Sequence, residues 1–314
     1  MQYRHLFGPV LSRRLGISLG VDLVTHKICS MNCVYCECGE TTVLTNERRQ
    51  YVSCEDVCRE LDHYWAYNDD PDYITFSGSG EPTLNIGLGQ VIAHITKKKP
   101  GIQVAVLTNA TLMGDPGVRA ELALADLVVP SVDAVSPETF YRINRPCTSI
   151  QPADMIEGIA DFRKQFSGDV WLEIFVLPGI NDTPKELALL KTAIQKIQPH
   201  RVQLNTLDRP GTVSTLRPAT PQELERVIHI LDEHNVEIIA RAGTGTKKRQ
   251  TQDPEAAILE TIHRRPCTRE DLAAVLGLHK QEVDRLLADL TAKGCITSRQ
   301  EARGKFFLTV KGQT

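Results

Sequence analysis

Short apolar runs alternate with longer amphipathic stretches through most of the chain. The apolar runs, rich in β-branched residues, predict strands at 17–24, 73–76, 103–107, 126–132, 171–177 and 201–207, with a short one at 236–240. The stretches between them carry apolar positions at helical spacing, as at 52–66 and 87–99. Strands and helices that alternate with a period of roughly 30 residues predict an α/β fold with parallel strands and right-handed crossovers. About six such units fit, too few for a complete eight-fold barrel.

The pattern changes beyond residue 241. Residues 242–253 are polar, contain glycine and show no apolar period, which is typical of a linker. The sequence therefore predicts two domains, at 1–241 and 254–314, joined by this segment.

The second domain has the layout of three helices followed by two strands. Amphipathic stretches begin at Pro254, near Thr268 and near residue 279, and strand-like runs at 295–298 and 305–310 surround Gly304. Thr268 with an aspartate three residues later indicates a helix N-cap. This arrangement resembles a winged helix-turn-helix domain. Its third helix turns Val283, Leu286, Leu287 and Leu290 inward, and Lys280 and Arg285 are candidates for its outward face.

Three cysteines within eight residues carry the most specific chemical signal. Cys29, Cys33 and Cys36 have the spacing C-x3-C-x2-C, and a loop of this length can wrap three thiolates around one iron–sulfur cube. Three close ligands without an obvious fourth leave one iron open, which is typical of a catalytic rather than a structural metal site. A structural zinc loop or a set of free thiols is the alternative. Zinc would need a second ligand pair, and Cys54 and Cys58 stand at a spacing that is unusual for one.

Composition places the chain among ordinary globular proteins, with 41% hydrophobic and 24% charged residues and a net charge of −3. No run of about 18 apolar residues is present, so we expect no membrane-spanning helix. The first residues lack the layout of a signal peptide, and nine cysteines without one indicate a reducing, cytoplasmic compartment. Of these, Cys38, Cys54 and Cys58 either bind an auxiliary cluster or are plain thiols.

Polar residues follow several predicted strands, where the carboxyl ends of parallel strands form the active face of a β/α barrel. The segment 77–83 is rich in glycine, Thr108 and Asn109 follow the next strand, and Ser131 and Asp133 follow the one after. Each has a plainer interpretation. The first is a common β–α turn, and Thr108, Asn109 and Asp133 are suitable helix caps.

Further polar residues are candidates for binding a substrate. They are Arg13, Arg14, Arg142, Arg145, Gln203, Asn205 and Arg209. The first pair lies in the segment 7–20, which predicts an ordered loop leading into the first strand, and can be solvated or can grip a phosphate or carboxylate. The second pair lies at a helix end, which it can stabilise against the helix dipole. Glu173 stands in an apolar strand, where a carboxylate is costly unless it is paired or neutral.

The cysteine spacing, with Tyr35 before the last cysteine, resembles the signature of the radical S-adenosylmethionine (radical SAM) superfamily. The resemblance implies an open (β/α)6 partial TIM barrel in which Cys29, Cys33 and Cys36 hold a 4Fe–4S cluster. S-adenosylmethionine chelates the fourth iron, and one electron from a reductant such as flavodoxin or ferredoxin cleaves it to a 5′-deoxyadenosyl radical. The implied contacts to this cofactor are Tyr35, Gly78, Gly80, Glu81, Thr108, Asn109, Ser131 and Asp133.

Segments 7–20 and 178–182 also resemble relatives of the tRNA wyosine-synthesis radical enzymes. Those enzymes take extra cluster ligands from upstream of the main motif, and this chain has no cysteine before Cys29. Three hypotheses follow: an enzyme that modifies tRNA or other RNA, an enzyme acting on a protein, peptide or small metabolite with the winged helix as a docking module, and a non-catalytic iron–sulfur sensor. A sensor needs no Gly-Glu-Pro loop, which argues against the third.

The predicted wing is biased toward positive charge. Residues 291–314 contain Lys293, Arg299, Arg303, Lys305 and Lys311 but only one acid, Glu301. Such a wing can meet nucleic-acid phosphates, or it can be a solvated face or a surface for a protein.

Overall fold

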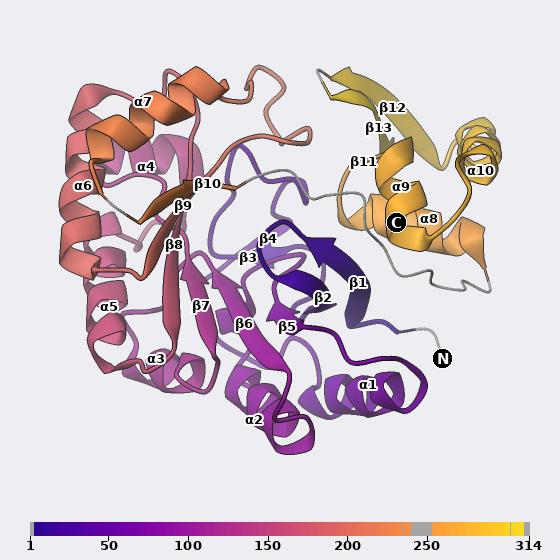
Figure 1. The fold of residues 1–314 in the computed structure, drawn as a ribbon, viewed down its shortest axis with the longest axis horizontal. Coiled ribbons are helices and arrows are strands. Elements are labelled where there is room, and N and C mark those ends of the chain that lie inside the picture. The colour runs from indigo at the N-terminus through magenta and orange to yellow at the C-terminus, as the bar shows by residue number, and fades with distance from the viewer. Residues whose placement is uncertain (1–2, 234, 240–252, 302, 311–314) are drawn as a thin grey trace.

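The computed structural model describes residues 3–233, 235–239, 253–301 and 303–310. The first domain is built on one open sheet with the strand order β1-β2-β5-β6-β7-β8-β9-β10 (Figure 1). Its strands are β1 (Leu6–Ser12), β2 (Gly16–Val21), β5 (Tyr73–Phe76), β6 (Gln103–Thr108), β7 (Leu127–Pro130), β8 (Asp169–Phe175), β9 (Arg201–Asn205) and β10 (Val236–Ile238). Every neighbouring pair from β2 to β10 is parallel, which confirms the α/β partial barrel.

Helices connect these strands and lie along the outer side of the sheet (Figure 1). They are α1 (Cys54–Tyr67), the short 3-10 helix η1 (Pro82–Leu84), α2 (Leu88–Lys98), α3 (Pro116–Leu122), α4 (Pro137–Asn144), α5 (Pro152–Gln165), α6 (Pro184–Ile197) and α7 (Pro221–Leu231). Helices α3 to α7 all begin with proline, whose fixed φ and missing N–H suit the first helical position. Because helices cover one face and the barrel interior the other, the strands read as nearly continuous apolar runs.

The sequence prediction was wrong at the beginning of the sheet. The segment expected to be a loop contains β1, which pairs antiparallel with β2. Gly16, at φ +67°, supplies the left-handed backbone where the chain reverses between them, and Arg13 and Arg14 lie beside this turn. Strand β2 also ends earlier than predicted, because Asp22 is buried and accepts hydrogen bonds from the N–H and hydroxyl of Ser79. A short parallel pair, β3 (Ile28–Cys29) and β4 (Val43–Leu44), follows.

The winged helix is confirmed in the second domain. Its elements are α8 (Pro254–Arg264), β11 (Cys267–Thr268), α9 (Arg269–Leu276), α10 (Lys280–Ala292), β12 (Ile296–Glu301) and β13 (Gly304–Thr309). Thr268 and Asp271 form a capping box on α9, and the predicted apolar face of α10 is buried. Of the predicted linker, only Asp253 lies among the described residues, and it caps α8. None of the described helices combines the length and apolar character needed to cross a membrane.

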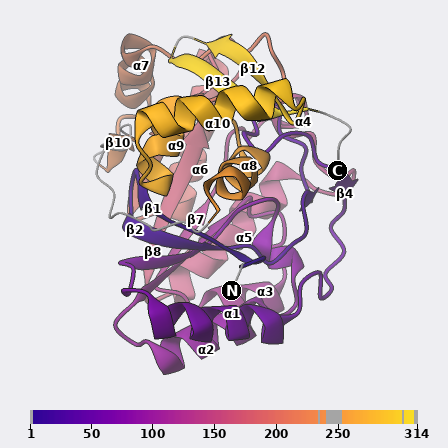
Figure 2. The same cartoon turned by 90° about the vertical axis from the view of Figure 1, so that its right-hand side faces the viewer.

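The winged helix lies against the β1–β2 side of the sheet. Figure 2 shows α8, α9 and α10 stacked over β1 and β2, and α9 contacts β1. The two domains therefore share a boundary, whose lining includes Glu37 and Cys38, next to the predicted ligand Cys36.

Candidate active site

Residues 28–39, here called the cysteine loop, are held between other strand-end loops of the barrel. On one side Gly80 is so close that a Cβ there would lie 1.8 Å from the carbonyl oxygen of Ile28, so only glycine fits. On the other side the Thr212 hydroxyl and the Val213 N–H donate to the carbonyl of Val34, at 2.8 and 3.1 Å. These contacts fix the loop backbone at the carboxyl end of the barrel strands.

Each predicted ligand sulfur accepts a hydrogen bond from a side-chain nitrogen. The pairs are Lys27 Nζ to Cys36 Sγ at 2.7 Å, Asn144 Nδ2 to Cys33 Sγ at 3.4 Å and Asn109 Nδ2 to Cys29 Sγ at 3.5 Å. Donors to ligand sulfur stabilise the thiolate and help to set the reduction potential of an iron–sulfur cluster. Three sulfurs on one loop, each with its own donor, fit such a cluster.

The three thiols differ in acidity. Burial raises the pKa of Cys29 to about 12 and also raises the pKa of Cys33. A hydrogen bond from the Cys38 thiol, together with the positive charge of Lys27, lowers the pKa of Cys36 to about 6 despite its burial. Cys36 is therefore ready to bind as a thiolate, whereas the other two need the charge of the metal to lose their protons.

A single zinc ion does not suit this arrangement. Among the described residues, no three His, Cys, Asp or Glu side chains are grouped as one metal ion would require. The possible auxiliary set is also dispersed, because Cys38 contacts the carbonyl of Gly78, whereas Cys54 packs on Gly87 at the start of α2. The three sulfurs thus fit a multi-iron cluster on the cysteine loop, whereas Cys54 and Cys58 of α1 have no third metal ligand grouped with them among the described residues.

Glu81 lies at the end of β5, as predicted, and is only 2% exposed. Its Oε1 accepts from the N–H and hydroxyl of Thr83 and from the hydroxyl of Thr108, and its Oε2 accepts from the N–H of Asn109 at 2.7 Å. The carboxylate therefore joins the loops that follow β5 and β6. Thr108 and Asn109 do not cap a helix, since α3 begins later with Asp115 as its cap.

Asp133 is fully engaged as well, and its interpretation as a helix cap is wrong because Ser136 caps α4. It accepts from the Tyr35 hydroxyl at 2.6 Å, from Asn144 Nδ2 at 2.7 Å and from the Phe175 N–H at 2.9 Å. Burial raises the pKa of Asp133 to about 6. The Tyr35 ring stacks on Phe175 with 3.9 Å between centroids, so the aromatic residue of the motif is fixed at the end of β8.

The predicted contact residues thus come together around the cysteine loop. Gly78, Thr108 and Ser131 stand at the ends of β5, β6 and β7, and the Ser131 N–H donates to the Thr108 carbonyl. Two neighbours of the sulfurs, Lys27 and Asn144, were not predicted. Asn144 lies in the segment where sequence reasoning selected Arg142 and Arg145, and both of these arginines are exposed.

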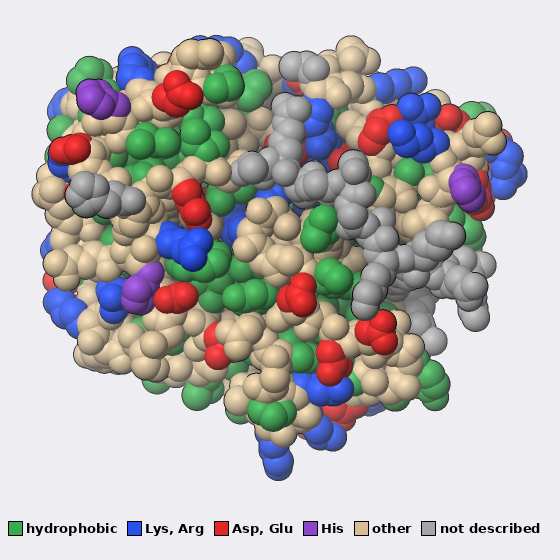
Figure 3. Space-filling view, viewed as in Figure 1, with side chains coloured by type: hydrophobic (Ala, Val, Ile, Leu, Met, Phe, Trp, Pro, Cys, Tyr) green, Lys and Arg blue, Asp and Glu red, His purple; other side chains and the backbone are tan. Residues whose placement is uncertain are grey.

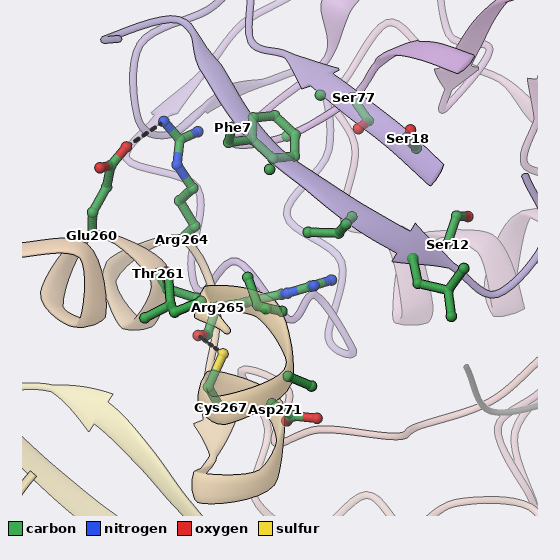
Figure 4. A pocket seen from close by; sticks show the side chains of 18 of the residues that line it. Phe7, Ser12, Ser18, Ser77, Glu260, Thr261, Arg264, Arg265, Cys267 and Asp271 are labelled. Atoms are coloured by element: carbon green, nitrogen blue, oxygen red, sulfur yellow. Dashed lines mark hydrogen bonds and ion pairs between the residues drawn. The ribbon is translucent and has the colours of Figure 1, made fainter. Parts of the chain in front are cut away.

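A cavity of about 1240 Å³ lies between the barrel and the winged helix. It reaches the predicted site at Glu37 and Cys38 of the cysteine loop and at Ser77 and Gly78 after β5, although the three ligand cysteines do not line it. Figure 4 shows Phe7, Ser18 and Ser77 on its barrel side. Arg265, Cys267 and Asp271 stand on the winged-helix side of the same view.

Of the predicted substrate contacts, Arg13, Arg14 and Arg209 line this cavity. Gln203 and Asn205 lie behind them, accepting hydrogen bonds from Arg14 at 2.9 Å and Arg13 at 3.4 Å. The partly buried Glu173 has the partner that its position requires, because it forms a short ion pair with Arg14.

Four charged side chains join the two domains at the rim of the cavity. Arg209 contacts Asp271 of α9 at 2.6 Å and Glu37 of the cysteine loop at 3.4 Å. Arg303, in the wing, pairs with Asp208 at 3.0 Å and also forms a short pair with Asp271. Arg209, Arg303, Asp208 and Asp271 are here called the interdomain latch.

The latch corrects the interpretation of the basic wing. Arg303 is turned inward to the barrel and is not available to a phosphate. Other wing cations also have protein partners: Arg299 pairs with Glu301, Lys293 with Glu255, and Lys305 lies over the Phe307 ring. Lys311 is outside the described residues.

Comparison with known proteins identifies the barrel. The model of the Radical SAM superfamily matches residues 23–190, which include the whole cysteine loop and the strand ends described above. The chain belongs to the radical SAM superfamily. A second family model, that of the MarR family, matches residues 250–305 and so covers most of the winged helix.

Several relatives align over most of this chain. A UPF0026 protein of Synechocystis sp. is 37% identical over 230 residues, covering 73% of this chain and 81% of the relative. A UPF0026 protein of Methanocaldococcus jannaschii is 34% identical over 231 residues, covering 72% and 71%. A Brachyspira hyodysenteriae protein named GTPase Obg is 35% identical over 94% of this chain, but the match spans only 43% of that protein.

Solved structures share the fold of this radical SAM barrel. A radical SAM methyltransferase from Sphaerobacter thermophilus has a TM-score of 0.55 at 14% identity, covering 70% of this chain and 65% of that one. TYW1 with a lysine–pyruvate adduct has a TM-score of 0.50 at 16% identity, covering 69% and 74%. Radical SAM family members are enzymes that bind a 4Fe–4S cluster and S-adenosylmethionine, so this chain is a radical SAM enzyme.

Proposed function

We propose that this enzyme acts on a substrate held in the cavity between the barrel and the winged helix. The observation that carries the proposal is the position of this cavity, which extends from the winged helix to the cysteine loop and the glycine-rich loop after β5. When bound, the cluster and S-adenosylmethionine supply a 5′-deoxyadenosyl radical that abstracts hydrogen from the substrate. The barrel excludes water around this chemistry and orients the reacting groups.

Within this proposal Cys29, Cys33 and Cys36 hold the cluster. Lys27 places a positive charge beside Cys36, which favours the reduced, more negative cluster. The residues that contact S-adenosylmethionine are those at the strand ends: Tyr35, Gly78, Gly80, Glu81, Thr108, Asn109, Ser131 and Asp133. Segments 7–20 and 178–182 support a relationship to the wyosine-synthesis enzymes, and the lack of a cysteine before Cys29 sets the chain apart from them.

Glu81→Ala is expected to keep the iron content and to weaken S-adenosylmethionine binding about ten- to a hundred-fold, since a charge-assisted hydrogen bond is worth about 1.5–3 kcal/mol. Titration of reconstituted protein with the cofactor measures this. Thr83→Val keeps the carboxylate but removes one of its donors, so it should weaken binding less. Unchanged affinity in Glu81→Ala would show that this carboxylate only joins two loops.

The winged helix, in this proposal, closes the cavity and does not dock RNA. The outward face of α10 is mixed in sign, because Asp284 pairs with Arg269 of α9, and Arg285 with Asp289. Figure 3 likewise shows acidic and basic side chains interspersed over the winged helix on the face it presents. Neutralising several phosphates needs a clustered positive surface, which this face does not offer.

Gel-shift titrations against tRNA, mixed RNA and duplex DNA at two salt concentrations test this point. We expect weak binding. The logarithm of the association constant should change little with the logarithm of salt concentration, because few cations of the described winged helix are available to neutralise phosphates and so release their counterions. Tight binding to tRNA with a slope of several units would instead favour the RNA-modifying hypothesis.

A further inference from the structure

The cavity between the domains contains positive charge that its own carboxylates do not neutralise. Each carboxylate in the lining is already engaged by the protein. Glu37 pairs with Arg209, Asp208 with Arg303, Asp271 with both of these arginines, Glu260 with Arg264 and Glu270 with Arg269, while Asp253 caps α8. Arg14 is paired with Glu173. Two arginines of the lining, Arg13 and Arg265, form no ion pair with any of these carboxylates.

Arg13 is partly buried on the barrel side. Its hydrogen bond to Asn205 Oδ1 is long, at 3.4 Å, and no carboxylate of the described residues lies within ion-pair distance of it. Burial lowers the pKa of its guanidinium, although Glu37 and Asp208 partly oppose this effect. A guanidinium has five N–H donors, and a cation taken out of water needs a charged or hydrogen-bonding partner.

Arg265 lies on the opposite wall, directly after α8. In Figure 4 its side chain extends from the winged helix into the space in front of the barrel strands. Within the described part of the chain, neither a hydrogen bond nor an ion pair holds its guanidinium. Both domains thus present an arginine with spare donors to the same cavity.

We propose that this cavity binds an acidic substrate, whose carboxylate or phosphate group is held by Arg13 from the barrel and Arg265 from the winged helix. The inference rests on the proposed function for the place where the substrate binds. Guanidinium groups pair with such oxyanions through two parallel hydrogen bonds, so they fix orientation as well as supplying charge. The oxyanion anchors the substrate at the domain boundary, from which the rest of the molecule extends toward Gly78.

The test uses the full, anaerobically reconstituted protein and two probes, inorganic phosphate and succinate. Isothermal titration at constant ionic strength, set with sodium chloride, gives their dissociation constants. Arg13→Gln and Arg265→Gln should each weaken the tighter probe about ten- to a hundred-fold. Arg13→Lys and Arg265→Lys keep the charge but lose the paired hydrogen bonds, so they should weaken binding of the probe less than the glutamine variants do. The control is Arg201→Gln, because Arg201 stands at the opposite end of β9 from Asn205 and stacks on Trp171.

A lower dissociation constant for phosphate than for succinate indicates a phosphorylated substrate. A lower dissociation constant for succinate indicates a carboxylic acid. Failure of the wild-type protein to bind either probe at millimolar concentration would overturn the proposal, as would equal losses in Arg201→Gln and Arg13→Gln. Formation of 5′-deoxyadenosine without a substrate is measured on the same samples. If it occurs while anion binding is absent, only this inference fails; if anions bind but no 5′-deoxyadenosine forms, the proposed function fails.

Discussion

Cys33→Ala is expected to abolish both cluster assembly and cleavage of S-adenosylmethionine. Anaerobically reconstituted wild-type protein should bind about four irons per chain and form 5′-deoxyadenosine with a strong reductant, as a three-cysteine 4Fe–4S site requires. Cys33 belongs to the short loop that also carries Cys29 and Cys36. Its sulfur accepts a hydrogen bond from Asn144 Nδ2. Two remaining thiolates cannot hold the cube in place. Iron analysis, visible absorption and product chromatography measure the two losses.

Cys54→Ser and Cys58→Ser are the matched controls. Both residues lie on α1, away from the cysteine loop, so iron content and cleavage should stay at wild-type levels. Wild-type cleavage in Cys33→Ala would remove the central claim. Loss of iron in a control variant would mean that α1 also holds part of a cluster.

Asp271→Asn is expected to weaken the docking of the winged helix onto the barrel. One carboxylate neutralises both Arg209 and Arg303, whose side chains are 10% and 20% exposed. Breaking a buried charge pair by removing one partner costs about 3–5 kcal/mol when the other charge is left without compensation. The loss here is smaller, because Arg209 keeps Glu37 and Arg303 keeps Asp208. The isosteric amide still accepts the capping hydrogen bond on α9, so the change acts mainly on charge. Thermal unfolding and amide hydrogen exchange along β1 measure the loss of docking.

Asp284→Asn provides a matched control on the same domain. Asp284 pairs with Arg269 on the exposed side of the winged helix, where an ion pair is worth about 0–1 kcal/mol. Its exchange pattern along β1 should match that of the wild type. Equal behaviour of the two variants would show that the latch contributes nothing to docking.

The local sequence patterns of the chain were sufficient to predict most of the fold. Strand β5 has the predicted bounds, α1 and α2 are close to theirs, and the cap on α9 is the predicted one, because apolar period and capping residues are local properties. Strand β1 was missed because a turn-rich segment with two arginines lacks a strong alternating pattern. Its pairing with β2 depends on how the chain reverses at Gly16.

The chemistry around the cysteines was predictable in part. Spacing identified the three sulfurs, but it could not identify Asn144 as a donor to Cys33, since they stand 111 positions apart in the sequence. The same limit applied to Arg303. Its neighbours in the sequence suggested a basic wing, whereas its partner Asp208 lies 95 positions away. The docking of the two domains decides which charged residues pair. A local sequence pattern cannot predict such pairs.

The position of the winged helix in the chain has a consequence for biosynthesis. Ribosomes make the barrel first, and at about 5–20 residues per second the latch residues Asp271 and Arg303 follow the last barrel strand by several seconds. Until then Arg209 has no partner in the winged helix, and the side of the cysteine loop that bears Glu37 is uncovered. The Glu37 side of the cysteine loop is therefore open to solvent on the nascent chain until the winged helix docks.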